Sequence, residues 1–366
     1  MTLGREKLKF LNTPTPIQRL DNISADLGIN LYLKRDDLTN FGTGGNKLRK
    51  LEYLVKDAID QGCTMLLTVG GAQTTHGRLT GAVAAKYGLK AAIVAVAPCP
   101  GEMSANLLLD GIMGWPVYLV QQDGVHTDSE LEKAAVAKVT KEWEEKGEKV
   151  YFIPVGGSNE LGILGYYDCA NEIAQQVEEM GLEDVRLVST CGSFGTYMGL
   201  AVAIKNENLP IRLTGIGISP KPHGLLDYAM KYYHRIKEFF GDELKDLEMT
   251  EADFDVTSDY DHGAYNNPVK EVREAMYYMG QKEAIIVDPC YTGKTFAGIL
   301  EMVKEGKIKQ GENVIMLHTG GIPGIYTKHH RVEMEKELGD YIHILKIRNT
   351  DTKKERELPS LWCFLI

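Results

Sequence analysis

Lys47 stands where a side-chain amine can become a nucleophile. It follows the glycine turn of Gly44-Gly45-Asn46 and opens a segment whose apolar residues recur at spacings of three and four, the period of a helix. The positive end of a helix dipole and burial both disfavour an ammonium, so the pKa of such a lysine falls below its free value of ~10.4. A desolvated, electropositive pocket of this kind suits Schiff-base chemistry. The alternative, a solvated lysine at a helix start, stays open from this motif alone.

Glycine-rich turns follow several predicted strands, in the segments 69–76, 190–196 and 318–321. Because ligands of open α/β sheets bind beyond the carboxyl ends of the strands, we expect these turns to converge on one cleft. The second turn suits a phosphate best, since its backbone N–H groups, two hydroxyls and the following helix N-terminus can all face an anion. Its members are Gly192, Ser193, Phe194, Gly195 and Thr196. A tight strand-to-helix turn without a ligand is the alternative for any one of them.

Two tyrosines lie in segments that could bring a phenol to the same cleft. Tyr291 follows residues 287–290, which we predict to be the end of a strand broken by Pro289. Tyr265 lies in the turn-rich segment 262–268, which we predict to cap a helix. A phenol at such a position can take part in proton transfer. Because the chain contains 18 tyrosines, a packing role is the alternative for each of the two.

Two nucleotide-binding patterns are incomplete. The Gly-Lys-Thr run at 293–295 lacks the Walker glycine, because Asp288 occupies that position. The Gly-x-Gly at 215–217 lacks the third glycine of a dinucleotide fingerprint, because Pro220 stands there. Both observations argue against a nucleotide-binding P-loop and against a Rossmann dehydrogenase.

No metal site is expected. His76 has no histidine or carboxylate at metal-ligand spacing, and the pair at 329–330 lies in a charged segment. Six cysteines are scattered without a Cys-x-x-Cys pair, so we expect reduced, mostly buried thiols rather than disulfides or zinc ligands.

The composition is that of a globular protein large enough for two domains, with 366 residues, 43% hydrophobic and 25% charged. A formal net charge of -10, without a basic stripe interleaved with aromatics, argues against a nucleic-acid partner. The N-terminal residues lack the apolar core of a signal peptide, and no apolar run approaches the ~18 residues of a membrane span. We therefore expect a cytoplasmic protein with no membrane partner.

Short apolar runs alternate with segments of helical period between residues 60 and 220, which is typical of parallel strands joined by crossover helices. The predicted strands are 65–69, 91–97, 117–120, 150–154, 185–190, 212–218 and 313–318. The predicted helices lie near 75–88, 102–113, 129–147, 161–180, 195–206 and 293–304. The acidic segment 242–261 is poorly periodic and is predicted to be a connecting loop that carries function.

Taken in order, these motifs resemble the pyridoxal-phosphate enzymes of the tryptophan-synthase-β fold, fold type II. Within that fold they are similar to the family of D-cysteine desulfhydrase and 1-aminocyclopropane-1-carboxylate deaminase. The resemblance runs from about residue 13 to about residue 326. Its marks are the segments 32–37, 44–50, 70–76, 192–196, 288–294 and 318–321.

The resemblance implies an α/β fold, with an open, mostly parallel twisted sheet covered by helices on both faces and a smaller inserted α/β domain. The larger domain, which binds the cofactor, would comprise residues 1–50 and 166–340, and the smaller one residues 51–165. The cofactor, pyridoxal 5'-phosphate, would lie in the cleft between them. Most relatives are homodimers. The tail at 341–366 could dock on a partner subunit or be disordered, and the sequence does not decide between the two.

The resemblance also implies roles for individual residues. Lys47 would bond covalently to the cofactor, and the loop 192–196 would hold its phosphate, with Cys191 adjoining. The remaining cofactor contacts would be Asn46, Thr75, Thr292 and Thr319. The substrate would meet Gln73, Thr74, Thr75 and His76, and the further catalytic residues would be Thr74, Tyr265 and Tyr291.

The chain departs from the family pattern at four positions. Thr74 stands where relatives usually have a serine, Thr75 replaces the asparagine whose amide usually meets the ring oxygen of the cofactor, and Phe194 replaces a small residue in the phosphate loop. Thr292 stands where the cyclopropane deaminases have a glutamate that can keep the pyridine nitrogen protonated. A neutral residue there, Thr292 or Thr319, favours elimination of a good leaving group from Cβ.

We therefore predict a deaminating lyase that acts by β-elimination on a small Cβ-substituted amino acid, with D-cysteine as the first choice of substrate. The products would be pyruvate, sulfide and ammonia. The nearest alternative is 1-aminocyclopropane-1-carboxylate deaminase, and the next is a sulfo-lyase or β-replacement enzyme. An alternative of another class is a pyridoxal-phosphate-binding protein without turnover.

Overall fold

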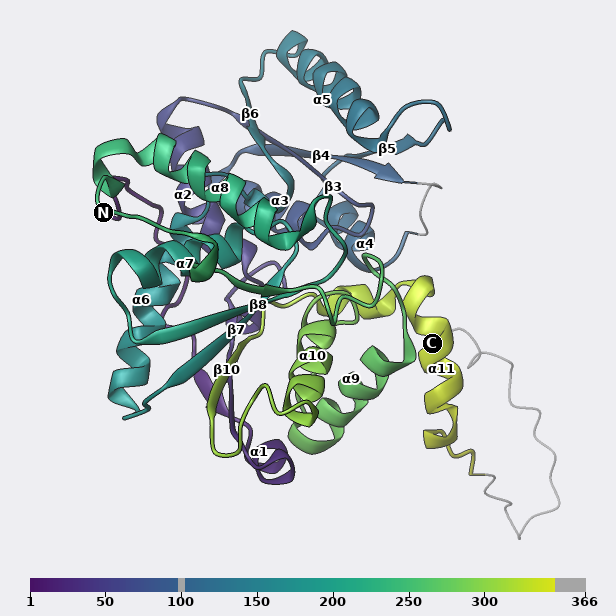
Figure 1. Cartoon of the computed structure of the whole chain (residues 1–366). Helices are drawn as coiled ribbons and strands as arrows, with labels where there is room; N and C mark the ends of the chain where they lie inside the picture. The colour runs from purple at the N-terminus through teal and green to yellow at the C-terminus, as the bar shows by residue number, and fades with distance from the viewer. Residues whose placement is uncertain (98–102, 346–366) are drawn as a thin grey trace, which may run out of the picture. The chain divides into compact units, whose positions relative to one another are not determined.

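The computed structural model describes residues 1–97 and 103–345 (Figure 1). Within these ranges the strands form one six-stranded and one four-stranded sheet. No helix in the described ranges is both long enough and apolar enough to cross a membrane.

The six-stranded sheet combines the start of the chain with its second half, in the order β1-β2-β10-β7-β8-β9. All of its neighbouring strands run parallel except β1, which pairs antiparallel with β2. Its strands are β1 (Ile17–Arg19), β2 (Asn30–Lys34), β7 (Val185–Cys191), β8 (Ile211–Gly217), β9 (Asp255–Thr257) and β10 (Asn313–Leu317).

The four-stranded sheet is entirely parallel, in the order β5-β4-β3-β6. Its strands are β3 (Met65–Gly70), β4 (Lys90–Ala97), β5 (Val117–Gln121) and β6 (Val150–Ile153). The central strands β3 and β4 are almost continuous apolar runs because helices cover the sheet on both faces, as parallel sheets require.

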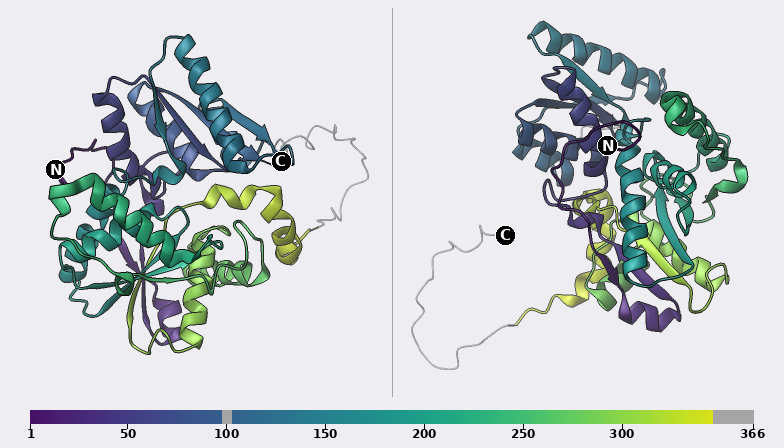
Figure 2. Two further views of the ribbon diagram at one scale, coloured as in Figure 1. Left: turned by 45° about the horizontal axis from the view of Figure 1, so that its top comes forward. Right: turned by 90° about the vertical axis from the view of Figure 1, so that its left-hand side faces the viewer.

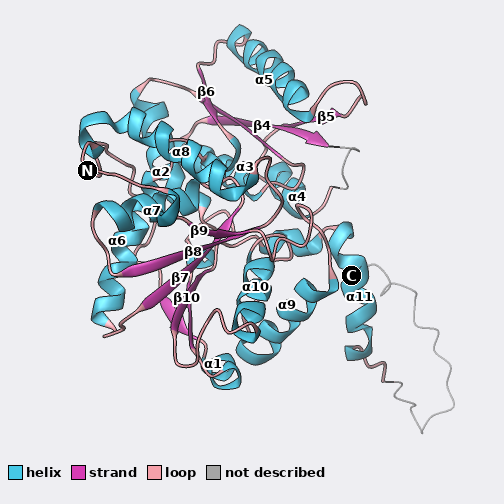
Figure 3. Cartoon of the chain, in the orientation of Figure 1, coloured by secondary structure: helices cyan, strands magenta, loops and turns pink. Residues whose placement is uncertain are grey.

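Helices connect the strands as crossovers (Figure 3). The α-helices are α1 (Asp21–Leu27), α2 (Lys47–Asp60), α3 (Thr75–Tyr87), α4 (Ala105–Ile112), α5 (Asp128–Glu145), α6 (Leu164–Glu179), α7 (Gly195–Asn206), α8 (Gly224–Phe240), α9 (Lys270–Glu283), α10 (Thr292–Lys304) and α11 (Lys328–Leu338). Short 3-10 turns are η1 (Asp36–Leu38), η2 (Val155–Gly157), η3 (Gly241–Leu244), η4 (Glu251–Asp253), η5 (Ile322–Tyr326) and η6 (Gly339–Tyr341).

Each sheet has its own hydrophobic core. On the smaller sheet, α2 and α3 pack against one face and α5 covers the other, as the left view of Figure 2 shows. On the larger sheet, side chains of α6, α7 and α8 pack with those of β2, β7 and β10. Helices α9 and α10 lie on the other side of this sheet (Figure 1). The predicted fold class, a mostly parallel α/β architecture with a second, smaller sheet, is confirmed.

The strands of the smaller sheet all fall inside the segment 51–165 that we assign to an inserted domain. The domain boundaries themselves stay a prediction. The cysteines at 63, 169, 191 and 290 are buried and free, in agreement with the expectation of reduced thiols. The predicted tail at 341–366 lies outside the described residues beyond position 345.

Three local predictions need correction. The acidic segment 242–261 is not a plain connecting loop, because it contains η4 and the strand β9, which extends the larger sheet beside β8. The segment 287–290 belongs to no strand, and the carboxylate of Asp288 accepts the backbone N–H groups of Cys290 and Tyr291 instead. The helix expected at 102–113 begins at Ala105, and position 102 lies outside the described residues.

Candidate active site

A cavity of about 420 Å³ lies at the carboxyl ends of strands from both sheets. Its walls come from the turn before α2, the β3–α3 turn, η2, the β7–α7 turn, the end of β8, the segments that precede α9 and α10, and the turn after β10. The predicted convergence of the glycine-rich turns is thereby confirmed, because residues of the segments 69–76, 190–196 and 318–321 all line this cavity.

Lys47 is the first residue of α2 and lines the cavity. Its amine donates a hydrogen bond to Oδ1 of Asn46 over 3.1 Å. Burial lowers the pKa of Lys47 to about 8, although the negative charge of Asp288 opposes the shift. With this pKa, roughly a fifth of the amine is neutral at about pH 7.4, and the neutral form is the one that attacks a carbonyl carbon.

The turn before Lys47 requires its glycines. Gly44 has a φ of +70°, and a Cβ on it would lie 2.1 Å from the carbonyl oxygen of Asp37. Asn46 then ties the turn to two others: its backbone N–H donates to the carbonyl of Thr319 over 3.1 Å, and its side-chain amide donates to Oγ1 of Thr196 over 3.0 Å. The start of α2 is thus bonded to the turns that follow β7 and β10.

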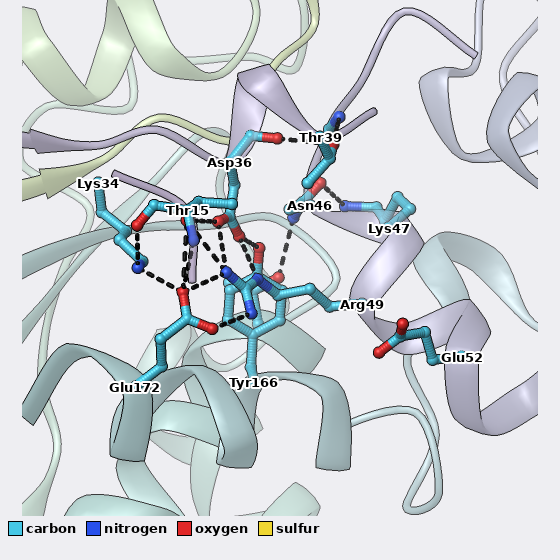
Figure 4. A network of polar contacts seen from close by, with 12 residues as sticks. Thr15, Lys34, Asp36, Thr39, Asn46, Lys47, Arg49, Glu52, Tyr166 and Glu172 are labelled. Atoms are coloured by element: carbon cyan, nitrogen blue, oxygen red, sulfur yellow. Dashed lines mark hydrogen bonds and ion pairs between the residues drawn. The ribbon is translucent and has the colours of Figure 1, made fainter. Parts of the chain in front are cut away.

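A buried ionic network anchors α2 two residues after Lys47 (Figure 4). Arg49 donates to both oxygens of Asp36, over 2.8 and 2.9 Å, and to both oxygens of Glu172, each over 2.9 Å. Tyr166 donates to Asp36 over 2.5 Å, and Lys34 forms a further ion pair with Glu172. Burial opposes the charge of Asp36, yet the guanidinium of Arg49 outweighs it and lowers the pKa of that carboxyl. The network joins α2 to the end of β2 and to α6.

The β7–α7 turn forms the predicted anion cradle. Phe194 adopts the left-handed conformation with a φ of 65° and precedes Gly195, the first residue of α7. A Cβ on Gly195 would lie 2.4 Å from Oγ of Ser158, so the turn depends on glycine there. The N–H of Gly195 donates to the carbonyl of Ser193 over 2.9 Å. The first N–H groups of a helix have no acceptor within it, so the start of α7 presents further donors and a positive dipole end on this side of the cavity.

The residues of this turn have different surroundings. The cavity is lined by Gly192, Ser193, Phe194 and Thr196. Gly195 and Cys191 do not line it, and the thiol of Cys191 packs in the core of the larger sheet. Cys191 is therefore next to the phosphate loop in sequence, but its thiol does not face the cavity.

Lys50 lies behind the cradle and is completely buried. Its amine donates to the carbonyl of Gly156 over 3.1 Å and to Oγ of Ser158 over 3.0 Å, and Ser158 in turn bonds Ser193 over 2.7 Å. Burial, helped by the charge of Lys47, lowers the pKa of Lys50 well below its usual value. Lys50 thus supports the cradle through a hydroxyl chain.

The β3–α3 turn contributes Thr74, Thr75 and His76 to the cavity wall. Thr74 caps α3, since its hydroxyl accepts the N–H of Gly77 over 3.2 Å. His76 is buried and its Nε2 lies 2.7 Å from Oγ1 of Thr68, while burial and the charges of nearby lysines lower its pKa well below the usual value. A neutral His76 can orient groups but carries no charge for a substrate anion.

Gln73 is placed differently from the rest of this turn. It does not line the main cavity, and its side chain bonds the start of α4, accepting the N–H of Asn106 over 2.9 Å and donating to the carbonyl of Ser104 over 3.2 Å. It faces a smaller cavity of about 260 Å³ that adjoins the first. The structure therefore assigns Gln73 a part in holding the turn in place.

Tyr265 and Tyr291 both line the cavity, and their hydroxyls are hydrogen-bonded to each other. Their rings meet edge to face with centroids 5.9 Å apart. Burial, with the neighbouring Tyr265 and Cys290, raises the pKa of Tyr291 well above its ordinary value. The phenol of Tyr291 therefore stays protonated at neutral pH and can act as a proton donor.

The two threonines expected near the cofactor ring are separated by the structure. Thr319 lines the cavity, whereas Thr292 is fully buried, does not line it, and donates its hydroxyl to Asp288 over 2.7 Å. Asp288 also accepts the N–H groups of Tyr291 and Thr292, over 2.9 and 2.8 Å. Thr292 is thus the first residue of α10 with its hydroxyl bonded to Asp288, and the expectation that it contacts the cofactor from the cavity wall is corrected.

Several residues at or behind the cavity wall are absent from the expected set. Lys50 lies one helical turn after Lys47, and Lys221 follows the carboxyl end of β8. Both could have been identified from the sequence, because side chains one helical turn apart share a face and ligands bind beyond strand ends. Glu132 of α5 and Tyr228 of α8 line the cavity from helices far away in the sequence. Only packing brings those two helices to the site, so no sequence pattern could have identified them.

Comparison with known proteins gives a consistent result. The family model described as pyridoxal-phosphate dependent enzyme matches residues 8–320. A putative 1-aminocyclopropane-1-carboxylate deaminase of Pyrococcus abyssi is 38% identical over 330 residues, which is 90% of this chain and 94% of the relative. A D-cysteine desulfhydrase of Serratia proteamaculans is 34% identical over 331 residues, which is 89% of this chain and 97% of the relative. The crystal structure of a homologue of the deaminase superimposes with a TM-score of 0.78 at 34% identity, over 92% of this chain and 95% of the other.

Proposed function

Because this chain belongs to the family of pyridoxal-phosphate dependent enzymes, we propose that it is a lyase that eliminates the Cβ substituent of a small amino acid and releases its nitrogen as ammonia. D-cysteine is the substrate we propose. D-cysteine and one water would then yield pyruvate, hydrogen sulfide and ammonia, which balances every atom. Relatives at 34 to 38% identity bear the names of the deaminase and of the desulfhydrase, so their names do not decide between the two substrates.

The residues of the cavity fit the cofactor. Lys47 offers an amine whose pKa is lowered to about 8, and the β7–α7 turn offers backbone N–H groups at a helix N-terminus for a phosphate. The close approach of Gly195 to Ser158, where a Cβ would not fit, keeps that turn tight enough to wrap an anion. Asn46 and Thr319, which also line the cavity, would hold the ring.

The site residues divide the chemical work. When bound, pyridoxal phosphate supplies the electron sink that lets a proton leave the Cα of the substrate. The neutral amine of Lys47 accepts that proton. The hydrogen-bonded pair of Tyr265 and Tyr291 donates a proton to the thiolate that leaves Cβ. Thr74 and Thr75, at the N-terminus of α3, bind the substrate carboxylate.

The observation that carries the choice of elimination is the neutral wall at Thr319. The buried carboxylate of Asp288 does not line this cavity and already accepts backbone N–H groups of its own segment. A hydroxyl such as that of Thr319 would hydrogen-bond the pyridine nitrogen without protonating it. An unprotonated pyridine ring is a weaker electron sink. It suffices when a good leaving group departs from Cβ, whereas opening a cyclopropane ring needs a stronger electron sink.

The second candidate function is 1-aminocyclopropane-1-carboxylate deaminase. It is favoured by the names of relatives, among them the putative deaminases of Pyrococcus abyssi and Pyrococcus furiosus at 38% identity. A β-replacement enzyme or a sulfo-lyase would use the same base and the same tyrosines.

An assay of the purified holoenzyme separates these functions. D-cysteine, L-cysteine, D-serine and 1-aminocyclopropane-1-carboxylate are supplied in parallel, and pyruvate, 2-oxobutyrate and sulfide are measured. We expect equal amounts of pyruvate and sulfide from D-cysteine and no 2-oxobutyrate. Formation of 2-oxobutyrate from the cyclopropane substrate would overturn the proposal, and no turnover of any substrate would favour a cofactor-binding protein without catalysis.

A further inference from the structure

Lys294 is a buried lysine for which the proposed chemistry has no use. It lies in the first turn of α10, and its side chain is completely inaccessible to solvent. Its ammonium donates hydrogen bonds to the backbone carbonyls of Ile218 over 2.9 Å, of Asp261 over 2.7 Å and of Ala264 over 2.6 Å. Lys294 lines neither of the two described cavities.

Three carbonyl oxygens take the place of a counter-ion here. A lysine ammonium has three N–H donors, and all three of Lys294 are used. A buried charge is expensive unless it is compensated, and inward-pointing carbonyl dipoles can compensate a monovalent cation as they do in a potassium filter. Burial lowers the pKa of Lys294, and the nearby groups of Cys290, Asp261 and Asp288 oppose that shift.

The three carbonyls belong to segments that shape the catalytic cavity. Ile218 itself lines the cavity after the end of β8. Asp261 and Ala264 are the two ends of the turn that leads into Tyr265, and within it His262 and Gly263 have φ values of 56° and 82°.

This turn has little regular structure to hold it. It lies between β9 and α9. Lys294 follows Tyr291 by three residues on α10, so its ammonium joins the two segments that carry the paired tyrosines. Lys294 thus bridges the segments that carry the two phenols, although no hydrogen bond joins it to either of them.

We propose that Lys294 is a built-in monovalent cation that positions Tyr265 against Tyr291, and that a potassium ion can occupy the same three carbonyl oxygens when the side chain is removed. The effect on turnover rests on the proposed function, because it assumes that the tyrosines donate the proton. Lys294 is a positioning residue, and the cation site itself does not depend on the reaction.

The first test is the activity of the Lys294→Ala holoenzyme in potassium chloride and in tetramethylammonium chloride at equal ionic strength. Tetramethylammonium is too large for the site and cannot donate hydrogen bonds. We expect kcat with D-cysteine to fall about 100-fold in tetramethylammonium chloride, with KM changed less than about threefold, and to recover at least tenfold in potassium chloride. Wild type should not respond to the change of salt.

A matched control lies on the same helix. Lys304 is exposed and pairs with Glu301, so Lys304→Ala removes an ammonium from α10 without opening a ring of carbonyls. It should behave as wild type in both salts. Lys294→Met fills the space with an uncharged chain, so its kcat should fall by a similar factor and show no recovery in potassium chloride.

The second test does not depend on catalytic turnover. Thermal unfolding of cofactor-free Lys294→Ala should occur about 2 °C higher in potassium chloride than in tetramethylammonium chloride, because an ion that binds only the folded state stabilises it. The wild-type and Lys304→Ala midpoints should differ by less. If wild type lacks lyase activity while this shift appears, the proposed function fails and the cation site stands.

Two results would overturn the inference. One is a Lys294→Ala protein whose kcat and unfolding midpoint are the same in both salts. The other is a Lys294→Met protein with the kcat of wild type. The methionine variant also decides the positioning role if Lys294→Ala does not fold in either salt.

Discussion

At the scale of single residues, the site is governed by how far each polar group is removed from water. Lys47 has a lowered pKa because burial outweighs the attraction of Asp288, while burial raises the pKa of Tyr291. One group is thereby made a base and the other is kept an acid at the same pH. Neither needs an ionic partner, so both can exchange protons with a substrate.

The lowered pKa of Lys47 predicts a specific pH dependence of its reactivity. In cofactor-free protein, the rate of acylation by acetic anhydride should rise through a midpoint at about pH 8, because the neutral amine prevails above the lowered pKa. Mass spectrometry of peptides from pH 6 to 10 measures this rate. The internal control is Lys146, an exposed lysine whose ion pair with Glu142 raises the lysine's pKa. Lys146 should react only at higher pH.

A midpoint for Lys47 at or above that of Lys146 would refute the desolvated pocket. In the holoenzyme, borohydride should fix the cofactor to Lys47, and Lys47→Ala should show neither the fixed adduct nor turnover. An adduct on another lysine of the variant would show that the wrong residue has been named.

The tyrosine pair predicts a loss of turnover rather than of binding. Tyr291→Phe should lower kcat about 100-fold with little change in KM, since it removes a proton donor and leaves the ring contact with Tyr265 in place. Steady-state kinetics with D-cysteine measure both constants. Tyr278→Phe, which removes a hydroxyl bonded to Asp26 at the surface, should leave kcat within about twofold of wild type.

At the scale of elements, the position of Lys47 depends on how α2 is held. The glycine turn before α2 sets where the helix begins. The charged side chains that surround Arg49 fix the helix to the end of β2 and to α6 (Figure 4). The network sets the buried Asp36 and the partly buried Glu172 against one guanidinium and one ammonium, so it is costly unless complete. Its completeness explains how a helix N-terminus can present an amine at a defined place.

Removal of Arg49 should therefore be strongly destabilising. Arg49→Met leaves the buried Asp36 and the partly buried Glu172 without their main partner, and we expect a loss of about 3–5 kcal/mol in the free energy of unfolding, measured by urea titration. Lys141→Met, which breaks the exposed pair with Glu145, should cost less than about 1 kcal/mol.

The same network also predicts an acid dependence. The pKa values of Asp36 and Glu172 are lowered in the folded state, so the stability they contribute is complete above their ordinary values and is lost as pH falls below those values. Wild type should therefore lose more stability than Arg49→Met between pH 6 and pH 3. Parallel pH profiles for the two proteins would contradict this description.

At the scale of the whole molecule, the parallel strands of two sheets direct their carboxyl ends at one cavity. The larger sheet contributes the anion cradle and the tyrosines, and the smaller one contributes the β3–α3 turn and Glu132. A site built from two sheets can place a base, a cradle and an acid around one ligand, although each comes from a different segment of the chain.

The assembly of the molecule is a separate prediction. The resemblance to homodimeric enzymes leads us to expect a particle of about twice the chain mass of 40.7 kDa. Light scattering coupled to size exclusion, with and without the cofactor, measures it. A mass of one chain at micromolar concentration would contradict the expected homodimer.

The features that could be predicted from sequence are those that depend on local hydrophobic periodicity and on the residues of turns. Alternating strand and helix patterns predicted the mostly parallel fold, and glycine turns at strand ends predicted one shared cavity that includes Lys47. These predictions succeeded because a helix start, a tight turn and a buried strand each depend on residues within one short segment. The errors at 242–261 and 287–290 arose where such segments are irregular.

Tertiary structure alone decided which side chains meet. Nothing in the sequence around Arg49 specifies Glu172 as a partner, nor that Lys294 would find three carbonyls from two distant segments. These outcomes depend on contacts between residues far apart in the chain. Whether a buried charge is compensated is settled only when packing has brought those residues together and excluded water from between them.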